Sequence, residues 1–177
     1  MSMPETETQR RAVAIAAALA AASPGDKAEA RRMGPAGSAL FWRQVARLGV
    51  SHAHEADWRL FTRLVALMTP ASREETIHET GRHLGAVLAD GGDRAKALNV
   101  PDAKPFLSEH RFARFLAARG AARGDHLERM IRMLARRGVT MDVVTLAQAV
   151  IGWSDDRLAA AYYKRIDQSL TKEPHDD

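Results

Sequence analysis

The stretch from Phe106 to Gly138, FLSEHRFARFLAARGAARGDHLERMIRMLARRG, decides the fold of this chain. In its second half, apolar residues recur at spacings of three and four, which predicts a helix with one buried stripe. These residues are Leu127, Met130, Ile131 and Leu134. The first half repeats the pattern more loosely, with Phe112, Phe115 and Leu116 expected to face inward. The stretch therefore predicts two adjacent amphipathic helices.

The polar faces of both predicted helices carry arginine. Between positions 111 and 137, eight arginines stand against two acidic residues, which gives a local net charge of +6. The arginines are Arg111, Arg114, Arg119, Arg123, Arg129, Arg132, Arg136 and Arg137. Because the whole chain carries only +4, the rest of it is slightly acidic and the positive charge is concentrated here. Three of these residues, Arg129, Arg132 and Arg136, are expected opposite the apolar stripe.

Two interpretations of this charge are open. Guanidinium groups fork onto phosphate oxygens and stay protonated, so a cluster of them is typical of a surface that binds a nucleic-acid backbone. Amphipathic helices in arginine-rich chains also carry such faces for solubility, with acidic partners one turn away. Such partners are few here, because only Asp125 and Glu128 lie four residues before an arginine of the stretch.

Length and composition narrow the class of protein. The 177 residues allow one domain or two small lobes that share an interface. No apolar run approaches the ~20 residues that span a bilayer, so we expect no membrane association. The alanine-rich residues 12–22 lack a convincing cleavage context, so we interpret them as an N-terminal helix rather than a signal peptide and expect a cytoplasmic protein. The absence of cysteine excludes disulfides, thiolate metal sites and a cysteine nucleophile.

Helical patterns also fill the first half of the chain, where no segment alternates as a β-strand does. Residues 25–35 predict a short helix with Asp26 as its N-cap and with Arg31 and Arg32 in its last turn, where they complement the helix dipole. Ser38 is expected to cap the following helix. Glu55–Met68 continues the series, with its aromatic and aliphatic residues on one face.

The next helix is predicted from a capping box. Ser72 and Glu75 have the S-x-x-E spacing, so we expect a helix that starts there and runs through Ala89. Beyond the central stretch, residues 139–151 predict one more helix, and Ser154 is expected to cap the last one.

We predict an all-α fold, a bundle of about eight to nine helices in two small lobes. Residues 91–105, GGDRAKALNVPDAKP, contain two glycines and two prolines and are predicted to form a linker or a long loop. The predicted N-terminal helical lobe then covers residues 1–90. The C-terminal helical lobe, which carries the basic face, covers residues 106–177.

A search for catalytic motifs gives no support for an enzyme. His78 and His83 resemble the H-E-x-x-H zinc motif, but the second histidine comes one residue too late to share an ion on a helix. His52 and His54 would need metal ligands from elsewhere. No nucleophile elbow, phosphate-binding glycine loop or dinucleotide fingerprint occurs. We therefore expect no catalytic residue, no cofactor and no metal.

The order of several segments resembles the small subunit of the type I-E CRISPR surveillance complex Cascade, the CasB family. The resemblance extends from about residue 10 to about residue 166. The segments are GDKAEARR (25–32), LFWRQVARL (40–48), HLGAVLADGG (83–92), SEHRFARFLAARG (108–120), DHLERMIRMLARRGVTMDVVTLAQAVIGW (125–153) and YY (162–163). No single segment is as specific as a metal or phosphate motif, but their order and spacing are distinctive together.

The resemblance implies an all-helical, non-catalytic protein that works inside a larger complex. Its implied partners are the guide RNA, the DNA as a single strand or in an R-loop, the backbone and large subunits of Cascade, and a second copy of the chain. The family's basic positions correspond to Arg32, Arg111 and Arg129. Their neighbours Arg31, Arg114 and Arg132 are expected to share the role, and Arg136 is added because it lies on the predicted arginine face. Ala86 stands where the family often has arginine, so a basic contact there is missing or is supplied by Arg82.

Two functions from different classes follow from these observations. In the first, the arginine face binds nucleic-acid backbone without reading sequence, as a protein that holds a guide–target heteroduplex requires. In the second, a helical assembly protein uses the same arginines to bind acidic partner subunits and touches no nucleic acid.

Overall fold

The fold is all-α, as predicted, in a computed structural model that describes residues 5–152 and 155–168. Within these ranges there are nine α-helices and one 3-10 turn, and the only extended pairing is an isolated bridge between His78 and Met141. The helices are α1 (Glu5–Ala21), α2 (Pro24–Arg32), α3 (Ala39–Leu48), α4 (Glu55–Met68), α5 (Leu84–Asp90), α6 (Glu109–Ala117), α7 (Gly120–Ala135), α8 (Val143–Ile151) and α9 (Asp155–Asp167). The 3-10 turn η1 (His52–His54) precedes α4.

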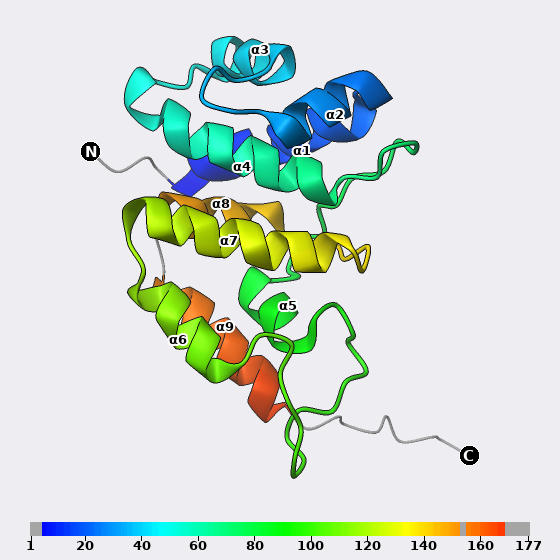
Figure 1. Ribbon diagram of the computed structural model, residues 1–177, viewed down its shortest axis with the longest axis vertical. Coiled ribbons are helices and arrows are strands. Elements are labelled where there is room, and N and C mark those ends of the chain that lie inside the picture. Colours follow the sequence, from blue (N-terminus) through cyan, green and yellow to red (C-terminus); the bar gives the residue numbers. More distant parts are fainter. Residues whose placement is uncertain (1–4, 153–154, 169–177) are drawn as a thin grey trace.

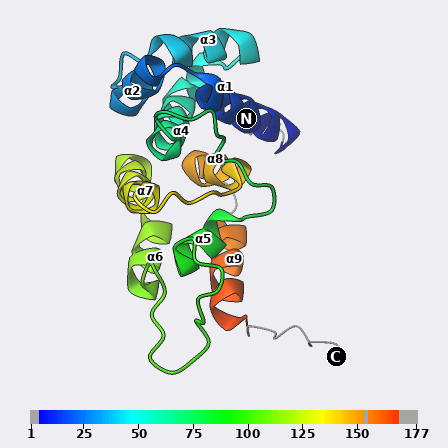
Figure 2. The same cartoon turned by 90° about the vertical axis from the view of Figure 1, so that its right-hand side faces the viewer.

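The helices are arranged along one long axis. Figure 1 shows α1 to α4 at one end, α7 and α8 across the middle, and α5, α6 and α9 at the other end. Figure 2, turned by 90°, keeps the same order and shows the loop after α5 hanging at the far end. The alanine-rich residues 12–22, predicted to be helical, lie in and just after α1, which packs on α4 and α8.

One apolar core runs through all three parts. Its aromatic members are almost completely buried and come from α3, α4, α6 and α9. Trp58 meets Phe61 edge to face in α4, with 5.3 Å between the ring centroids. Phe112 of α6 stacks on Tyr162 of α9 at 4.0 Å, and the Tyr162 hydroxyl donates to the Leu107 carbonyl. The inward faces predicted for the central stretch are thus the ones that hold α6 and α7 on the body.

The helix predicted from Ser72 and Glu75 is wrong. Residues 69–83 are not helical, and α5 begins only at Leu84, with the His83 side chain accepting from the Gly85 N–H as its cap. Distant residues instead form hydrogen bonds with backbone groups of this segment. The buried Lys27 ammonium donates to the Arg73 carbonyl, and the Ile77 carbonyl accepts from the Met141 N–H.

The same pairing shortens the helix predicted at residues 139–151. Met141 bonds across to the 77–79 segment, so α8 begins at Val143, and the Asp142 carboxylate caps it by accepting from the Val144 N–H. In α2 the cap is Ser23 rather than the predicted Asp26, which lies in the first turn. Ser38 caps α3 as expected. The predicted cap Ser154 lies outside the described residues.

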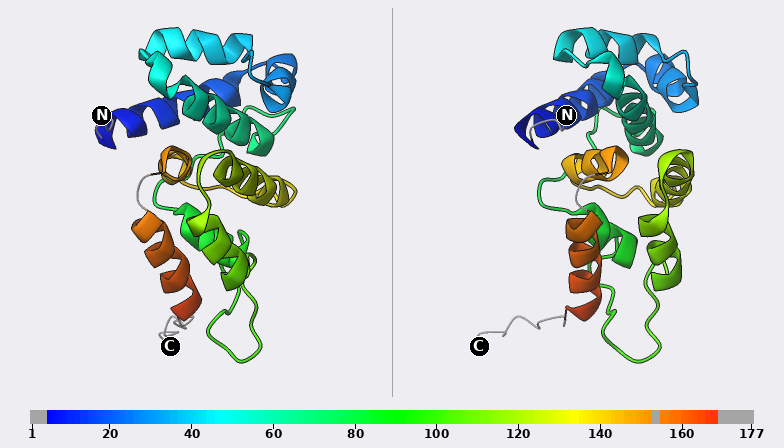
Figure 3. Two further views of the ribbon diagram at one scale, coloured as in Figure 1. Left: turned by 60° about the vertical axis from the view of Figure 1, so that its left-hand side comes forward. Right: turned by 90° about the vertical axis from the view of Figure 1, so that its left-hand side faces the viewer.

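The division of the chain into lobes 1–90 and 106–177 remains a prediction. The helix contacts cross the segment between them. Helices α4 and α5 precede this segment, but they pack on helices that follow it: α5 on α9, and α4 on α7 and α8 (Figure 3). The loop itself, from Gly91 to Leu107, contains no helix.

Candidate nucleic-acid interface

The two helices of the central stretch form the walls of a groove. They are joined by a tight turn at Ala118 and Arg119, and each buries its apolar stripe against the body. Arginines of both helices contribute to the lining of this groove. The groove has a volume of about 440 Å³. It is lined by Leu107, Arg111, Arg114, His126, Arg129, Met130, Arg132, Met133 and Arg136.

Five of the seven predicted site residues line this groove, which we call the α6–α7 groove. Arg111 and Arg114 come from α6, and Arg129, Arg132 and Arg136 come from α7 and its end. All five side chains belong to exposed residues. Two helices thus contribute positive charge to one hollow, which the sequence spacing alone does not establish.

Three of the groove arginines are free to meet a ligand. Arg111, Arg114 and Arg136 have no side-chain hydrogen bond or ion pair to any described residue. An anionic ligand would not have to displace a protein partner from them.

The other two groove arginines have partners within α7. The Arg129 Nε donates to the Asp125 carbonyl at 3.2 Å, which leaves its charge unpaired. Arg132 makes an ion pair with the Glu128 carboxylate at 2.7 Å. The same Glu128 oxygen accepts from Arg63 of α4 at 2.6 Å, so one carboxylate is shared between two guanidinium groups.

The floor of the groove is apolar. Leu107 and Met130 are almost completely buried, and Met133 packs partly against the core. His126 lines the same hollow. Leu107 belongs to the loop before α6, so no helix pattern could have assigned it to this site. Met130, predicted to be a core residue, belongs to the apolar core and also lines the groove.

The remaining arginines of the stretch have structural roles, so the basic face is narrower than the count of eight suggests. Arg123 is buried, donates to the Ala149 carbonyl and pairs with Asp155 at 2.5 Å, with its guanidinium 4.6 Å from the centre of the Phe115 ring. Arg119 donates to the carbonyls at the end of α6. Arg137 donates to the Gly91 carbonyl and lies over a second ring, Phe106.

The two predicted residues of α2 lie outside the groove. Arg31 donates to the carbonyls of Ala66 and Thr69 at 2.9 and 2.7 Å, and so fastens α2 to the end of α4. Arg32 is exposed and, within the described part of the chain, has no side-chain partner. A role for either in ligand binding stays a prediction.

The histidines singled out in the sequence do not gather around an ion. His78 accepts from the Val143 N–H through Nδ1, and His83 caps α5. Burial lowers the pKa of the His83 imidazole below its usual 6.5, although the nearby Asp142 carboxylate acts in the opposite direction. Across residues 5–152 and 155–168, no three histidine or acidic side chains are placed to share a metal ion.

Two further findings bear on the class of protein. None of the described helices combines the length and the apolar character that crossing a bilayer would require. A family model described as CRISPR-associated protein Cse2 matches residues 26–169, which is most of the chain. No curated protein and no solved structure matches this chain.

Proposed function

The chain belongs to the Cse2 family, the CasB subunits of type I-E CRISPR Cascade, and from this premise we propose that it binds nucleic acid through the α6–α7 groove. In this proposal the groove holds the backbone of the guide RNA, the target DNA or the displaced strand, and so stabilises the R-loop during antiviral defence. The subunit is non-catalytic, and it acts beside the backbone and large Cascade subunits and a second copy of itself.

The observation that carries the proposal is the convergence of five arginines from two helices on one hollow. Arginine binds phosphate oxygens through paired N–H groups and cannot lose its charge. In a complex where base pairing reads the sequence, the protein needs only a positively charged surface that is indifferent to sequence. Three partner-free guanidinium groups on fixed helices provide such a surface without rearrangement.

The proposal is tested by removing two of the three partner-free arginines, one from α6 and one from the end of α7. In Arg111→Gln with Arg136→Gln, the affinity of the full-length protein for single-stranded DNA should fall at low salt. The slope of log K against log salt is negative, and its magnitude should fall by about 1.4, because each of the two lost phosphate contacts to a single strand contributes about 0.7. Fluorescence anisotropy at several salt concentrations measures both quantities.

A matched control removes the same charge elsewhere. Arg43 and Arg47 are exposed on α3, far from the groove, and have no side-chain partner among the described residues. Arg43→Gln with Arg47→Gln should bind DNA as the wild type does. Equal losses in both double variants would show that only net charge matters and would overturn the groove assignment. Binding of poly-glutamate, with none to DNA, would favour the assembly protein instead.

A further inference from the structure

A second basic hollow lies where the loop after α5 meets α9. It has a volume of about 450 Å³, and no acidic residue lines it. Its polar and charged lining consists of Arg82, His83, Arg94, Lys164, Arg165 and Gln168. Four of these are cations, and they come from three separate segments of the chain. We call this hollow the loop-face site.

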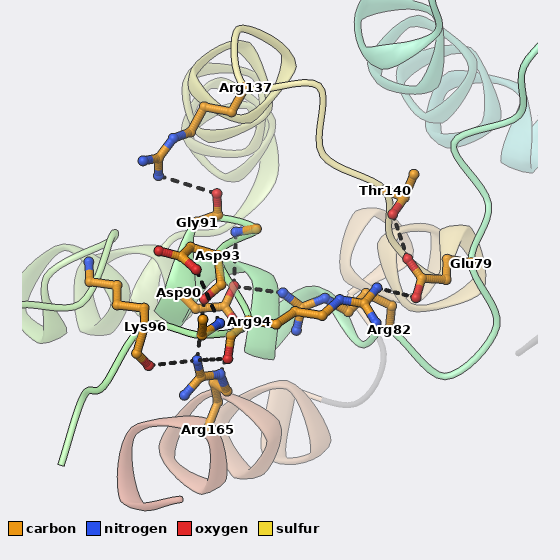
Figure 4. A network of polar contacts seen from close by, with 12 residues as sticks. Glu79, Arg82, Asp90, Gly91, Asp93, Arg94, Lys96, Arg137, Thr140 and Arg165 are labelled. Atoms are coloured by element: carbon orange, nitrogen blue, oxygen red, sulfur yellow. Dashed lines mark hydrogen bonds and ion pairs between the residues drawn. The ribbon is translucent and has the colours of Figure 1, made fainter. Parts of the chain in front are cut away.

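A buried network fixes the walls of the loop-face site (Figure 4). Asp90 is fully buried, and its two carboxylate oxygens pair with Arg82 at 2.7 Å and with Arg165 at 2.8 Å. Arg165 also donates to the carbonyls of Asp93, Arg94 and Lys96. One guanidinium therefore holds the backbone from which the Arg94 side chain projects.

The charges of the loop-face site leave it positive. Arg82 and Arg165 share one carboxylate, so the buried part of the network keeps one net positive charge. Buried charge is screened by salt much less than exposed charge. In front of it, Arg94 pairs with Glu79 at the edge of the site while its side chain stays 61% exposed. Lys164 is exposed and has no side-chain partner among the described residues.

A third hollow borders this site. Its charged lining consists of Arg82 and Arg94, which also line the loop-face site, together with Arg137 and Asp93. Arg137 follows directly after Arg136, the last arginine of the α6–α7 groove. Basic residues therefore occur at the end of the groove, in the hollow beside residues 137–140 and in the loop-face site.

We propose that the loop-face site binds a phosphate group of the same nucleic-acid strand after it leaves the groove at the end of α7. This inference rests on the proposed function and extends it by one site. Arg94 and Lys164 contact the phosphate oxygens directly. Arg82 and Arg165 act behind them, as positioning residues and as a source of positive potential.

The test removes the two exposed cations and leaves the buried network intact. For Arg94→Gln with Lys164→Gln, the full-length protein is titrated with a single strand of about 16 nucleotides, the upper site size of single-strand-binding folds. We expect several-fold weaker binding at low salt and a salt slope reduced by about 1.4, with an unchanged thermal midpoint. The control double variant of Arg43 and Arg47 should match the wild type.

The result separates the two proposals. If the groove variant loses affinity while the Arg94 and Lys164 variant binds with wild-type affinity and slope, the groove stands and the loop-face site is overturned. If neither variant differs from the α3 control, or the wild type binds no DNA at low salt, both proposals fail. A variant that binds DNA normally but loses poly-glutamate binding would assign the site to a protein partner.

Discussion

Among the described residues, Glu128 is the one acidic side chain that forms an ion pair with a groove arginine and so competes with a ligand for it. Its carboxylate pairs with Arg132 and also holds Arg63 of the neighbouring helix α4. The charge spacing of the sequence finds the first of these contacts, because the two residues are four apart on a helix. It cannot find the second, which joins residues 65 apart in the sequence.

We expect Glu128→Gln to tighten DNA binding. The amide oxygen can still accept from Arg63, but the negative charge beside Arg132 is gone. Because an exposed ion pair is worth up to about 1 kcal/mol, the affinity should rise by up to about 5-fold. Anisotropy titration measures the change. Glu74→Gln, an exposed residue in the 69–83 segment, makes the same charge change away from the groove and should have no effect. Weaker binding by Glu128→Gln would contradict the competition.

His83 should make stability depend on pH. Its Nδ1 accepts from the Gly85 N–H, which requires an unprotonated nitrogen, and burial lowers its pKa. The unfolded chain takes up the proton first as the pH falls below about 6.5, so this contribution is present above that pH and is lost below it. His83→Asn retains a cap and does not titrate. Urea unfolding at about pH 8 and about pH 5.5 should show a smaller pH loss for the variant. Equal losses would rule out His83 as the source.

At the scale of elements, the sequence predicts helices well where periodicity, caps and breakers agree. Glu55–Met68 matches α4 from end to end, and Ser38 caps α3. The capping box at Ser72 is followed by no helix, because a buried lysine and the pairing with residues 140–142 take up the backbone polar groups. Such contacts come from distant segments, so no local pattern contains them.

Gly85 permits the closest approach between two helices. A Cβ atom at this position would lie 2.4 Å from the Leu158 carbonyl oxygen and 2.9 Å from the Tyr162 nitrogen, both of α9. Since backbone atoms cannot move aside cheaply, Gly85→Ala should separate α5 from α9. We expect a loss of about 1–3 kcal/mol in the free energy of unfolding, measured by urea titration.

The control for this substitution is Gly25→Ala in α2. A Cβ there would meet only the Ser23 hydroxyl at 3.8 Å, which is an ordinary contact. Its stability should equal or slightly exceed that of the wild type, because alanine favours a helix more than glycine does. Similar losses in both variants would mean that the α5–α9 contact is looser than described.

At the scale of the whole molecule, the sequence predicts which stretch is basic but not which of its arginines are available. Arg123 and Arg111 are both arginines on a helix of the same stretch, yet Arg123 is buried against Asp155, a residue of α9. Likewise, the loop-face site joins Arg82, Arg94 and Lys164 from three segments that only the tertiary fold brings together. In the sequence these basic residues are scattered, so no local pattern predicts the loop-face site.

The contact between Asp90 and Arg165 joins residues that lie 75 positions apart. A ribosome synthesises α5 and the following loop long before it releases α9, so the buried face of α5 has no cover during that interval. The apolar side chains on that face of α5 therefore stay uncovered until synthesis is nearly finished. Closure of α5 on α9 is therefore a late, long-range step in the folding of the molecule.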